Sequence, residues 1–252
     1  MDIWMLYIIL LIVGVFAGVV NTLAGGGSLV TLPLLIFMGL PASVANGTNR
    51  VAVWVQCVAA VWGFRRNGVS NFKTCFWLSI PAVIGAIIGA QISVELPDEW
   101  FQKIIAVVML LVVALIVWNP NSTKAMNDYQ PSNYRLAGLV FFGIGFYGGF
   151  IQAGVGYLLM FGLTSICRFD LVRTAAAKVF IVAVYTSFAV LVFIINNQID
   201  WWYALILSFG NGIGGYIGSS MAVKRGAALI RWVLVITVTV MSAKLLGIIP
   251  EL

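Results

Sequence analysis

The chain has 252 residues, of which 62% are hydrophobic and 9% charged, and its mean hydropathy is +1.06. Soluble domains are about 45–50% apolar and about 25% charged, so this composition excludes a soluble domain and predicts an all-α integral membrane protein. Histidine is absent, and none of the eight acidic residues lies deep in an apolar run. The sequence therefore lacks the residues that form histidine metal sites, and its apolar segments lack the carboxylate pairs of acid–base catalysis. We expect neither an enzyme nor a bound cofactor. The 14 basic residues are scattered and form no face for nucleic acid.

Apolar segments follow one another along the chain, as in a bundle of transmembrane helices. They lie at 4–23, 28–39, 42–63, 74–94, 100–118, 134–151, 155–166, 171–195, 201–221 and 229–248. As helices, the segments 28–39 and 155–166 would be only about 18 Å long, whereas the hydrocarbon core is about 30 Å thick. Each of these two follows a glycine-containing break. We therefore expect roughly eight to ten hydrophobic segments, two of which are half-helices of re-entrant hairpins.

The two halves of the chain share an order of segments and align at an offset of 131 residues (182 − 51). The matched positions are Gly14 with Gly145, Gly18 with Gly149, Asn21 with Gln152, Gly25 with Gly156, and residues 51–54 with residues 182–185. This pattern predicts two transmembrane repeats, residues 1–120 and 134–252, joined by a cytoplasmic linker at 121–133. Each repeat would contain a broken helical hairpin and three full transmembrane helices.

Charge in the loops predicts that the two repeats have opposite orientations. Cytoplasmic loops collect Lys and Arg, so the basic loops 64–73 and 222–231 are expected inside the cell. The loops 95–99 and 196–200 carry acidic residues and are expected outside. Because the basic loop 64–73 corresponds to the acidic loop 196–200, the repeats are inverted, and both termini are expected outside.

Three adjacent glycines, Gly25, Gly26 and Gly27, interrupt the first hairpin, where each weakens a helix by about 1 kcal/mol relative to Ala. A helix that restarts near Ser28 leaves its first N–H groups free, and with the helix dipole they form a site for an anion. Ser28 could cap this helix or donate to the ligand, and Asn21 stands just before the break. The alternative is that the glycines only permit close packing or a tight hairpin.

The equivalent break in the second half is less rich in glycine and has a polar residue at each end. Its candidate substrate-binding residues are Gln152, Gly154, Gly156 and Tyr157. Because this break aligns with the first one, we expect the two breaks to meet near the midplane of the membrane, as in secondary transporters.

Two cations lie within apolar segments. Arg50 follows Thr48 and Asn49, about 12 Å into a helix that begins at Pro41, and Lys178 lies about 10 Å into the equivalent helix. Neither has an acidic residue within a helical turn, and an isolated cation in the membrane costs at least about 2.5–3.5 kcal/mol. A small anionic substrate is the expected partner of both. The alternative is that the cations reach the interface or bind backbone carbonyls of the broken helices.

Glycines repeat every fourth residue in the third full segment of each half. They are Gly85 and Gly89 in the first half and Gly210, Gly214 and Gly218 in the second. This spacing is typical of close contacts between helices, and we expect that role for them.

The chain resembles the sulfite exporter TauE/SafE family of membrane permeases. The resemblance rests on Gly14-x-x-x-Gly18, on the run Leu23-Ala24-Gly25-Gly26-Gly27-Ser28 that ends at Pro33, and on Ala45-Asn46-Gly47-Thr48-Asn49. It covers essentially the whole length and implies transport of sulfite, sulfoacetate or related organosulfonates, mostly out of the cytoplasm across a bacterial inner membrane. The substrate contacts that it implies are Gly25, Gly26, Gly27, Ser28, Thr48 and Asn49.

The second half departs from the family pattern. Val155 and Tyr157 interrupt its glycine cluster, and Val179 and Phe180 stand where Thr48 and Asn49 would repeat. The resemblance therefore leaves the contacts of the second half open.

We expect an alternating-access transporter that exports small sulfur-containing anions, driven by the membrane potential. Proton coupling is not expected, because the spans contain no acidic residue or histidine. The alternatives are an anion-selective channel, a carrier of small carboxylates, or a membrane subunit with no conducting role. The expected partners are the substrate and the lipid bilayer, and the sequence leaves a homo-oligomer open.

Overall fold

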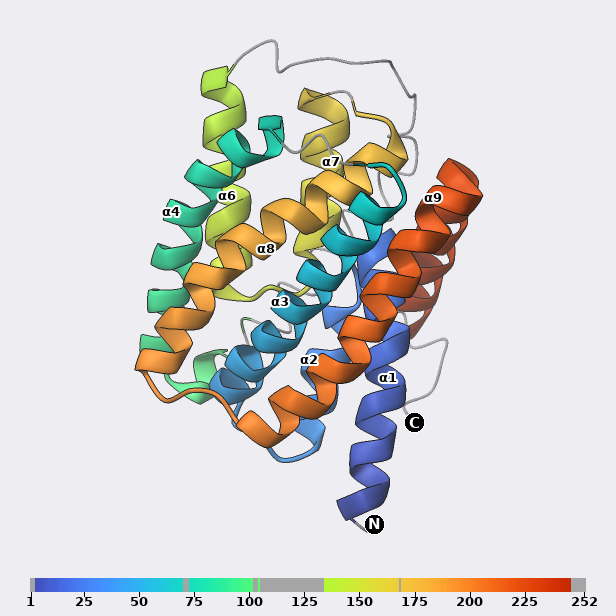
Figure 1. Ribbon diagram of the computed structural model, residues 1–252. Coiled ribbons are helices and arrows are strands. Elements are labelled where there is room, and N and C mark those ends of the chain that lie inside the picture. The colour runs from blue at the N-terminus through green and yellow to red at the C-terminus, as the bar shows by residue number, and fades with distance from the viewer. Residues whose placement is uncertain (1–2, 70–72, 102–103, 105–133, 168, 246–252) are drawn as a thin grey trace.

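The computed structural model describes the backbone of residues 3–69, 73–101, 104, 134–167 and 169–245 (Figure 1). Every element in this part of the chain is a helix. They are α1 Ile3–Leu23, α2 Ser28–Phe37, α3 Ala42–Arg66, α4 Lys73–Glu95, α6 Tyr134–Phe150, α7 Val155–Ile166, α8 Leu171–Ile195 and α9 Trp201–Leu245.

Three of the described helices are long and apolar enough to cross a membrane, over Trp4–Leu23, Lys73–Glu95 and Leu171–Ile195. The shorter apolar helices include α2 and α7, the two expected half-helices. Large apolar side chains such as those of Trp4, Trp77 and Leu205 are exposed on the outside of the bundle, where a bilayer would solvate them. The part of the chain that the structure describes is thus all-helical, and its apolar helices are those of a multi-pass membrane protein.

The expected segments agree with the helices except near the C-terminal end. The expected loop 222–231 has helical backbone, because it lies within α9 Trp201–Leu245. Figure 1 shows the chain turning back near the upper end, so that the last part of α9 lies behind its first part. The expected linker 121–133 and nearly all of the segment 100–118 lie outside the described residues.

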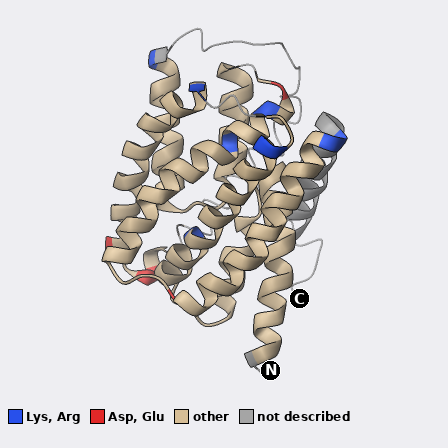
Figure 2. Cartoon of the chain, in the orientation of Figure 1, with Lys and Arg blue, Asp and Glu red and all other residues tan. Residues whose placement is uncertain are grey.

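Two helices of the first half run opposite to two helices of the second half in Figure 1. Helices α1 and α3 rise from the lower end, whereas α6 and α8 descend from the upper end. Figure 2 shows most Lys and Arg residues at the upper end and most Asp and Glu residues at the lower end. The upper end includes the C-terminus of α3 with Arg65 and Arg66 and the N-terminus of α4 with Lys73.

The acidic residues of the loops cap helix N-termini, whose first N–H groups need acceptors. The Asp98 carboxylate accepts hydrogen bonds from the backbone N–H groups of Ala42 and Ser43 at the start of α3, at 3.0 and 2.9 Å. Asp170 caps α8, and Asp200 accepts from two N–H groups in the first turn of α9. These carboxylates therefore shape the loops as well as setting their charge.

Glycine faces bring helices of different halves into close contact. An ideal Cβ on Gly14 would lie 3.3 Å from the Cα of Gly210, and a Cβ on Gly18 would lie 3.1 Å from the Cα of Gly214. These pairs join α1 to α9, and Gly145 and Gly149 pack in the same way on α4. The predicted role of the spaced glycines in helix contacts is confirmed.

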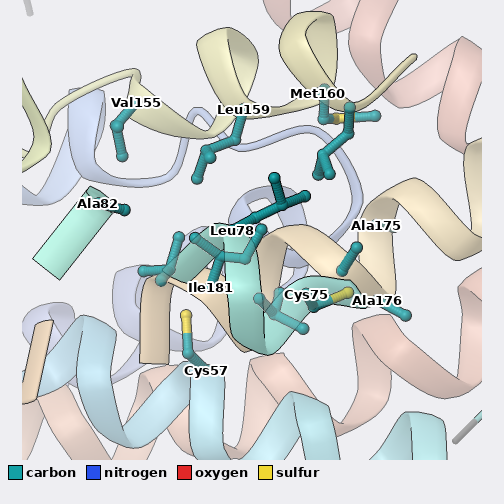
Figure 3. Packing of buried hydrophobic residues seen from close by; sticks show 14 of the residues in the cluster. Cys57, Cys75, Leu78, Ala82, Val155, Leu159, Met160, Ala175, Ala176 and Ile181 are labelled. Carbon is teal, nitrogen blue, oxygen red and sulfur yellow. The ribbon is translucent and has the colours of Figure 1, made fainter. Parts of the chain in front are cut away.

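Apolar side chains of α3, α4, α7 and α8 form the largest buried cluster, part of which Figure 3 shows. The cluster includes one labelled residue from each of these helices in turn, namely Cys57, Leu78, Leu159 and Ile181. The three cysteines, Cys57, Cys75 and Cys167, are buried and free and pack as small apolar residues.

We expect Gly145→Ala to destabilise the protein and Gly143→Ala to leave its stability unchanged or to raise it by up to about 1 kcal/mol, because Ala is the better helix former. Both glycines lie in α6, but a Cβ at position 145 would strike the backbone of Ala82 in α4, whereas one at position 143 would meet nothing within 4 Å. Overpacking of this kind costs about 1–3 kcal/mol. Thermal unfolding of the purified variants measures the difference, and equal stability of the two would contradict the close contact.

Candidate functional site

The breaks of the two hairpins touch each other inside the molecule. Helix α1 ends at Leu23 and α2 begins at Ser28, while α6 ends at Phe150 and α7 begins at Val155. A Cβ built on Gly25 would lie 2.5 Å from the Cα of Gly156, so only glycine fits at this crossing.

Left-handed backbone conformations occur in both breaks. Gly25 has a φ of 96° and Gly154 a φ of 74°, which glycine adopts without steric cost. Gln152 has a φ of 66°, which is uncommon for a residue with a side chain. A positive φ is incompatible with a right-handed α-helix, so the backbone leaves the helical conformation at Gly25 and at Gln152.

The first N–H groups of α2 are free, as the sequence predicted. The backbone N–H groups of Gly26, Gly27 and Ser28 form no hydrogen bond with any described residue, and bonding resumes with Leu29, which donates to the Gly26 carbonyl at 3.1 Å. The expected capping role of Ser28 was wrong, because Gly27 holds the N-cap position and no side chain caps the helix. Ser28 is instead the first helical residue.

Arg50 is fully buried and binds the C-terminal end of α6. Its guanidinium donates to the carbonyl oxygen of Gly148 at 2.7 Å, to that of Gly149, and to the side-chain oxygen of Gln152 at 3.4 Å. It also lies 4.8 Å from the ring centroid of Phe193. Cations at a helix C-terminus satisfy carbonyls that lack helical partners, and here the helix belongs to the other half of the chain.

Lys178 makes the corresponding contact in the opposite direction. Its Nζ donates to the carbonyl oxygens of Asn21 at 2.7 Å and Thr22 at 2.8 Å, in the last turn of α1. The structure therefore shows the alternative that the sequence left open, in which Arg50 and Lys178 bind backbone carbonyls of the broken helices. Each half supplies the cation that holds the broken helix of the other.

A small cavity lies where the two breaks meet. Its lining residues are Asn21, Ser28, Gln56, Cys57, Gln152, Val155, Gly156, Lys178, Val179 and Val182. The sequence predicted five of them as site residues, namely Asn21, Ser28, Gln152, Gly156 and Lys178. It placed Arg50 beside them, but Arg50 is not among the lining residues.

Amide side chains organise the cavity wall. Asn21 Nδ2 donates to Gln56 Oε1, and Gln56 Nε2 donates to the Thr22 hydroxyl at 2.9 Å. Gln56, which is fully buried, was not predicted as a site residue, although an amide residue two turns after Arg50 in an apolar segment was a usable signal in the sequence. Tyr185, whose hydroxyl donates to Gln152 Oε1 at 3.4 Å, was not predicted either.

The remaining predicted residues lie outside the cavity lining. Thr48 accepts a hydrogen bond from the backbone N–H of Asp200 at 2.9 Å, and Asn49 accepts one from the Thr31 hydroxyl at 2.7 Å. These contacts fasten α3 to the start of α9 and to α2. The predicted substrate contacts of Thr48 and Asn49 have no support in this arrangement.

The glycines of the breaks serve close approach. The ring of Tyr157 packs on Gly26, where a Cβ would lie 2.9 Å from its Cε2 atom, and a Cβ on Gly27 would lie 2.7 Å from that of Asn21. The sequence left two roles open for these glycines, close packing and free N–H groups. Gly26 and Gly27 show both.

The electrostatics of the cavity favour negative charge. Lys178 is the charged residue among the lining residues, and the wall carries no carboxylate. The N–H groups of Ser28 and Gly156 and the Ser28 hydroxyl donate to no described residue. Donors without acceptors next to a cation suit an oxyanion.

Comparison with known proteins identifies relatives over nearly the whole chain. The family described as sulfite exporter TauE/SafE matches residues 10–245. A probable membrane transporter protein of Haemophilus influenzae is 29% identical over 94% of this chain and 93% of its own length. The probable membrane transporter protein YfcA of Escherichia coli is 26% identical over 94% of this chain and 88% of its own length. No solved structure matches. The chain therefore belongs to the sulfite exporter TauE/SafE family, whose curated members found here are probable membrane transporters.

Proposed function

We propose that the protein exports small sulfur-containing anions, such as sulfite or an organosulfonate, by alternating access across a bacterial inner membrane. The observation that carries the proposal is the cavity between the two broken hairpins, which combines the Lys178 ammonium with free donors on Ser28 and Gly156. A sulfonate or sulfite head group has three oxygens that can accept from these donors. The family description and the names of the relatives point to the same substrate class and to transport.

The transport mechanism that we propose uses two inverted repeats. The opposite directions of α1 and α6 and of α3 and α8 support it, as does the meeting of the equivalent residues Gly25 and Gly156 at the centre. Rocking of one repeat against the other would open the cavity to each side in turn. By the positive-inside rule the basic end faces the cytoplasm, which puts the N-terminus outside.

The membrane potential supplies the driving force in this proposal. The described spans hold no histidine, and their one acidic residue, Glu95, is the exposed last residue of α4 and lies outside the interior where a coupled proton would be carried. With the cell interior negative, one negative charge that leaves gains about 2.3 kcal/mol per 100 mV. Export of an anion therefore needs no coupling ion.

We expect sulfite or methanesulfonate to stabilise the detergent-purified protein, and Lys178→Met to abolish this stabilisation. Ligand at about 100 times its Kd adds about 2.7 kcal/mol to the free energy of unfolding, and Lys178 is the cation of the cavity. The measurement is the shift in Tm with anion concentration, with chloride and sulfate for comparison. Lys73→Met makes the same change at an exposed helix start and should keep the full shift. Equal shifts in both variants would contradict the site.

We expect transport in proteoliposomes to respond to an imposed potential. For a singly charged anion, 100 mV changes the equilibrium distribution about 50-fold, because it contributes about 2.3 kcal/mol. Accumulation of radiolabelled sulfite is measured with valinomycin and graded potassium gradients. Accumulation that ignores the potential would rule out uncoupled electrogenic transport.

Counterflow distinguishes a carrier from an anion channel. Vesicles preloaded with unlabelled substrate should take up labelled substrate faster than empty vesicles, because a loaded carrier returns its site across the membrane with each exchange. A channel offers a continuous path and shows no such acceleration. If counterflow were absent and the flux did not saturate with substrate concentration, the protein would be a channel and not a carrier.

A further inference from the structure

Gln152 occupies an unusual position in the cavity wall. It is almost fully buried, with 2% of its surface exposed, and its backbone has the left-handed φ of 66°. Non-glycine residues keep such conformations where the surrounding structure holds them, and these positions cluster at functional sites. Here the conformation places a long amide side chain in the link between α6 and α7, next to the cavity.

Two donors fix the orientation of the Gln152 amide. Arg50 Nη1 and the Tyr185 hydroxyl both lie 3.4 Å from Gln152 Oε1, so the oxygen end of the amide is occupied. The Nε2 end donates to no described residue, while the side chain lines the cavity. Gln56 differs, because its Oε1 accepts from Asn21 and its Nε2 donates to Thr22. Of these two glutamines, Gln152 keeps a free pair of N–H groups.

Three donors on different elements therefore surround the cavity. Lys178 on α8 uses two of its three ammonium protons on the carbonyls of Asn21 and Thr22, which leaves one. Ser28 on α2 offers its hydroxyl, and Gln152 offers its amide N–H groups. A sulfonate or hydrogen sulfite presents three oxygens to these donors, whereas a carboxylate presents two.

We propose that Gln152, oriented by Arg50 and Tyr185, is the residue that makes this cavity prefer a three-oxygen sulfur head group to a carboxylate. The inference rests on the proposed function and adds a specificity-determining residue to it. Gln152 touches the substrate, whereas Arg50 and Tyr185 are positioning residues. A site built to bond a given polar group discriminates against analogues that lack it, because its buried donors are then left unpaired.

Methanesulfonate and acetate form the matched pair of probes, since both carry a methyl group and one negative charge. The apparent Kd of each is measured from the dependence of Tm on anion concentration, and the KM of each from uptake into proteoliposomes. In Gln152→Met, which keeps the length of the side chain but removes the amide, methanesulfonate should bind about tenfold more weakly, as expected for one lost buried hydrogen bond. Acetate binding should change less than about twofold. Equal losses for both anions would overturn the inference.

Tyr185→Phe tests the positioning role separately from the fold. It removes one hydroxyl that bonds Gln152 and should lower the preference for methanesulfonate over acetate in the otherwise unchanged protein. In the Gln152→Met background the same substitution should leave the preference as it is, because the amide is already gone. An equal effect in both backgrounds would show that Tyr185 acts independently of Gln152. Tyr216→Phe, at the exposed contact with Arg66, is the control for loss of a hydroxyl.

The wild-type protein separates failure of this inference from failure of the proposed function. A protein that binds both anions without preference rejects the role of Gln152 but keeps anion transport. A protein that binds neither anion rejects the proposed function and this inference with it.

Discussion

The reciprocal binding of two cations to two broken helices is the interaction on which the rest of the structure depends. A helix that stops inside a membrane leaves backbone carbonyls without partners, and a cation inside a membrane lacks a counter-charge. Arg50 donates to the Gly148 carbonyl, and Lys178 donates to the Asn21 carbonyl. Each contact gives a free carbonyl a donor and gives a buried cation a partner with partial negative charge. Because each cation and its carbonyls belong to opposite halves, the same contacts also hold the halves together.

The glycine contacts are organised in the same crossed way. Helix α1 of the first half packs on α9 of the second, and α6 of the second half packs on α4 of the first. The crossing of Gly25 with Gly156 adds a further close approach between the backbones of the two halves. The cavity lies at the same place, where backbone N–H groups of both breaks donate to no described residue.

Sequence patterns predicted the breaks, the half-helices, the spaced glycines and five lining residues of the cavity, because each leaves a local signal in composition or spacing. The partners of Arg50 and Lys178 could not be predicted in the same way. Every residue has a backbone carbonyl, so the sequence does not show which carbonyl accepts a hydrogen bond from either cation. Thr48 and Asn49 adjoin Arg50 in sequence, but successive helical residues point about 100° apart, so Thr48 reaches α9 and Asn49 reaches α2.

The crossed contacts also bear on how the protein is made. Gly14 and its partner Gly210 lie 196 residues apart (210 − 14), and ribosomes add roughly 5–20 residues per second. Helix α1 is therefore in the membrane for roughly 10 to 40 seconds before the helix that covers its glycine face exists. The carbonyls of Asn21 and Thr22 at the end of α1 likewise have no Lys178 to bind until that residue has been synthesised. The packing of α1 on α9 can therefore form only after the second half of the chain has been made.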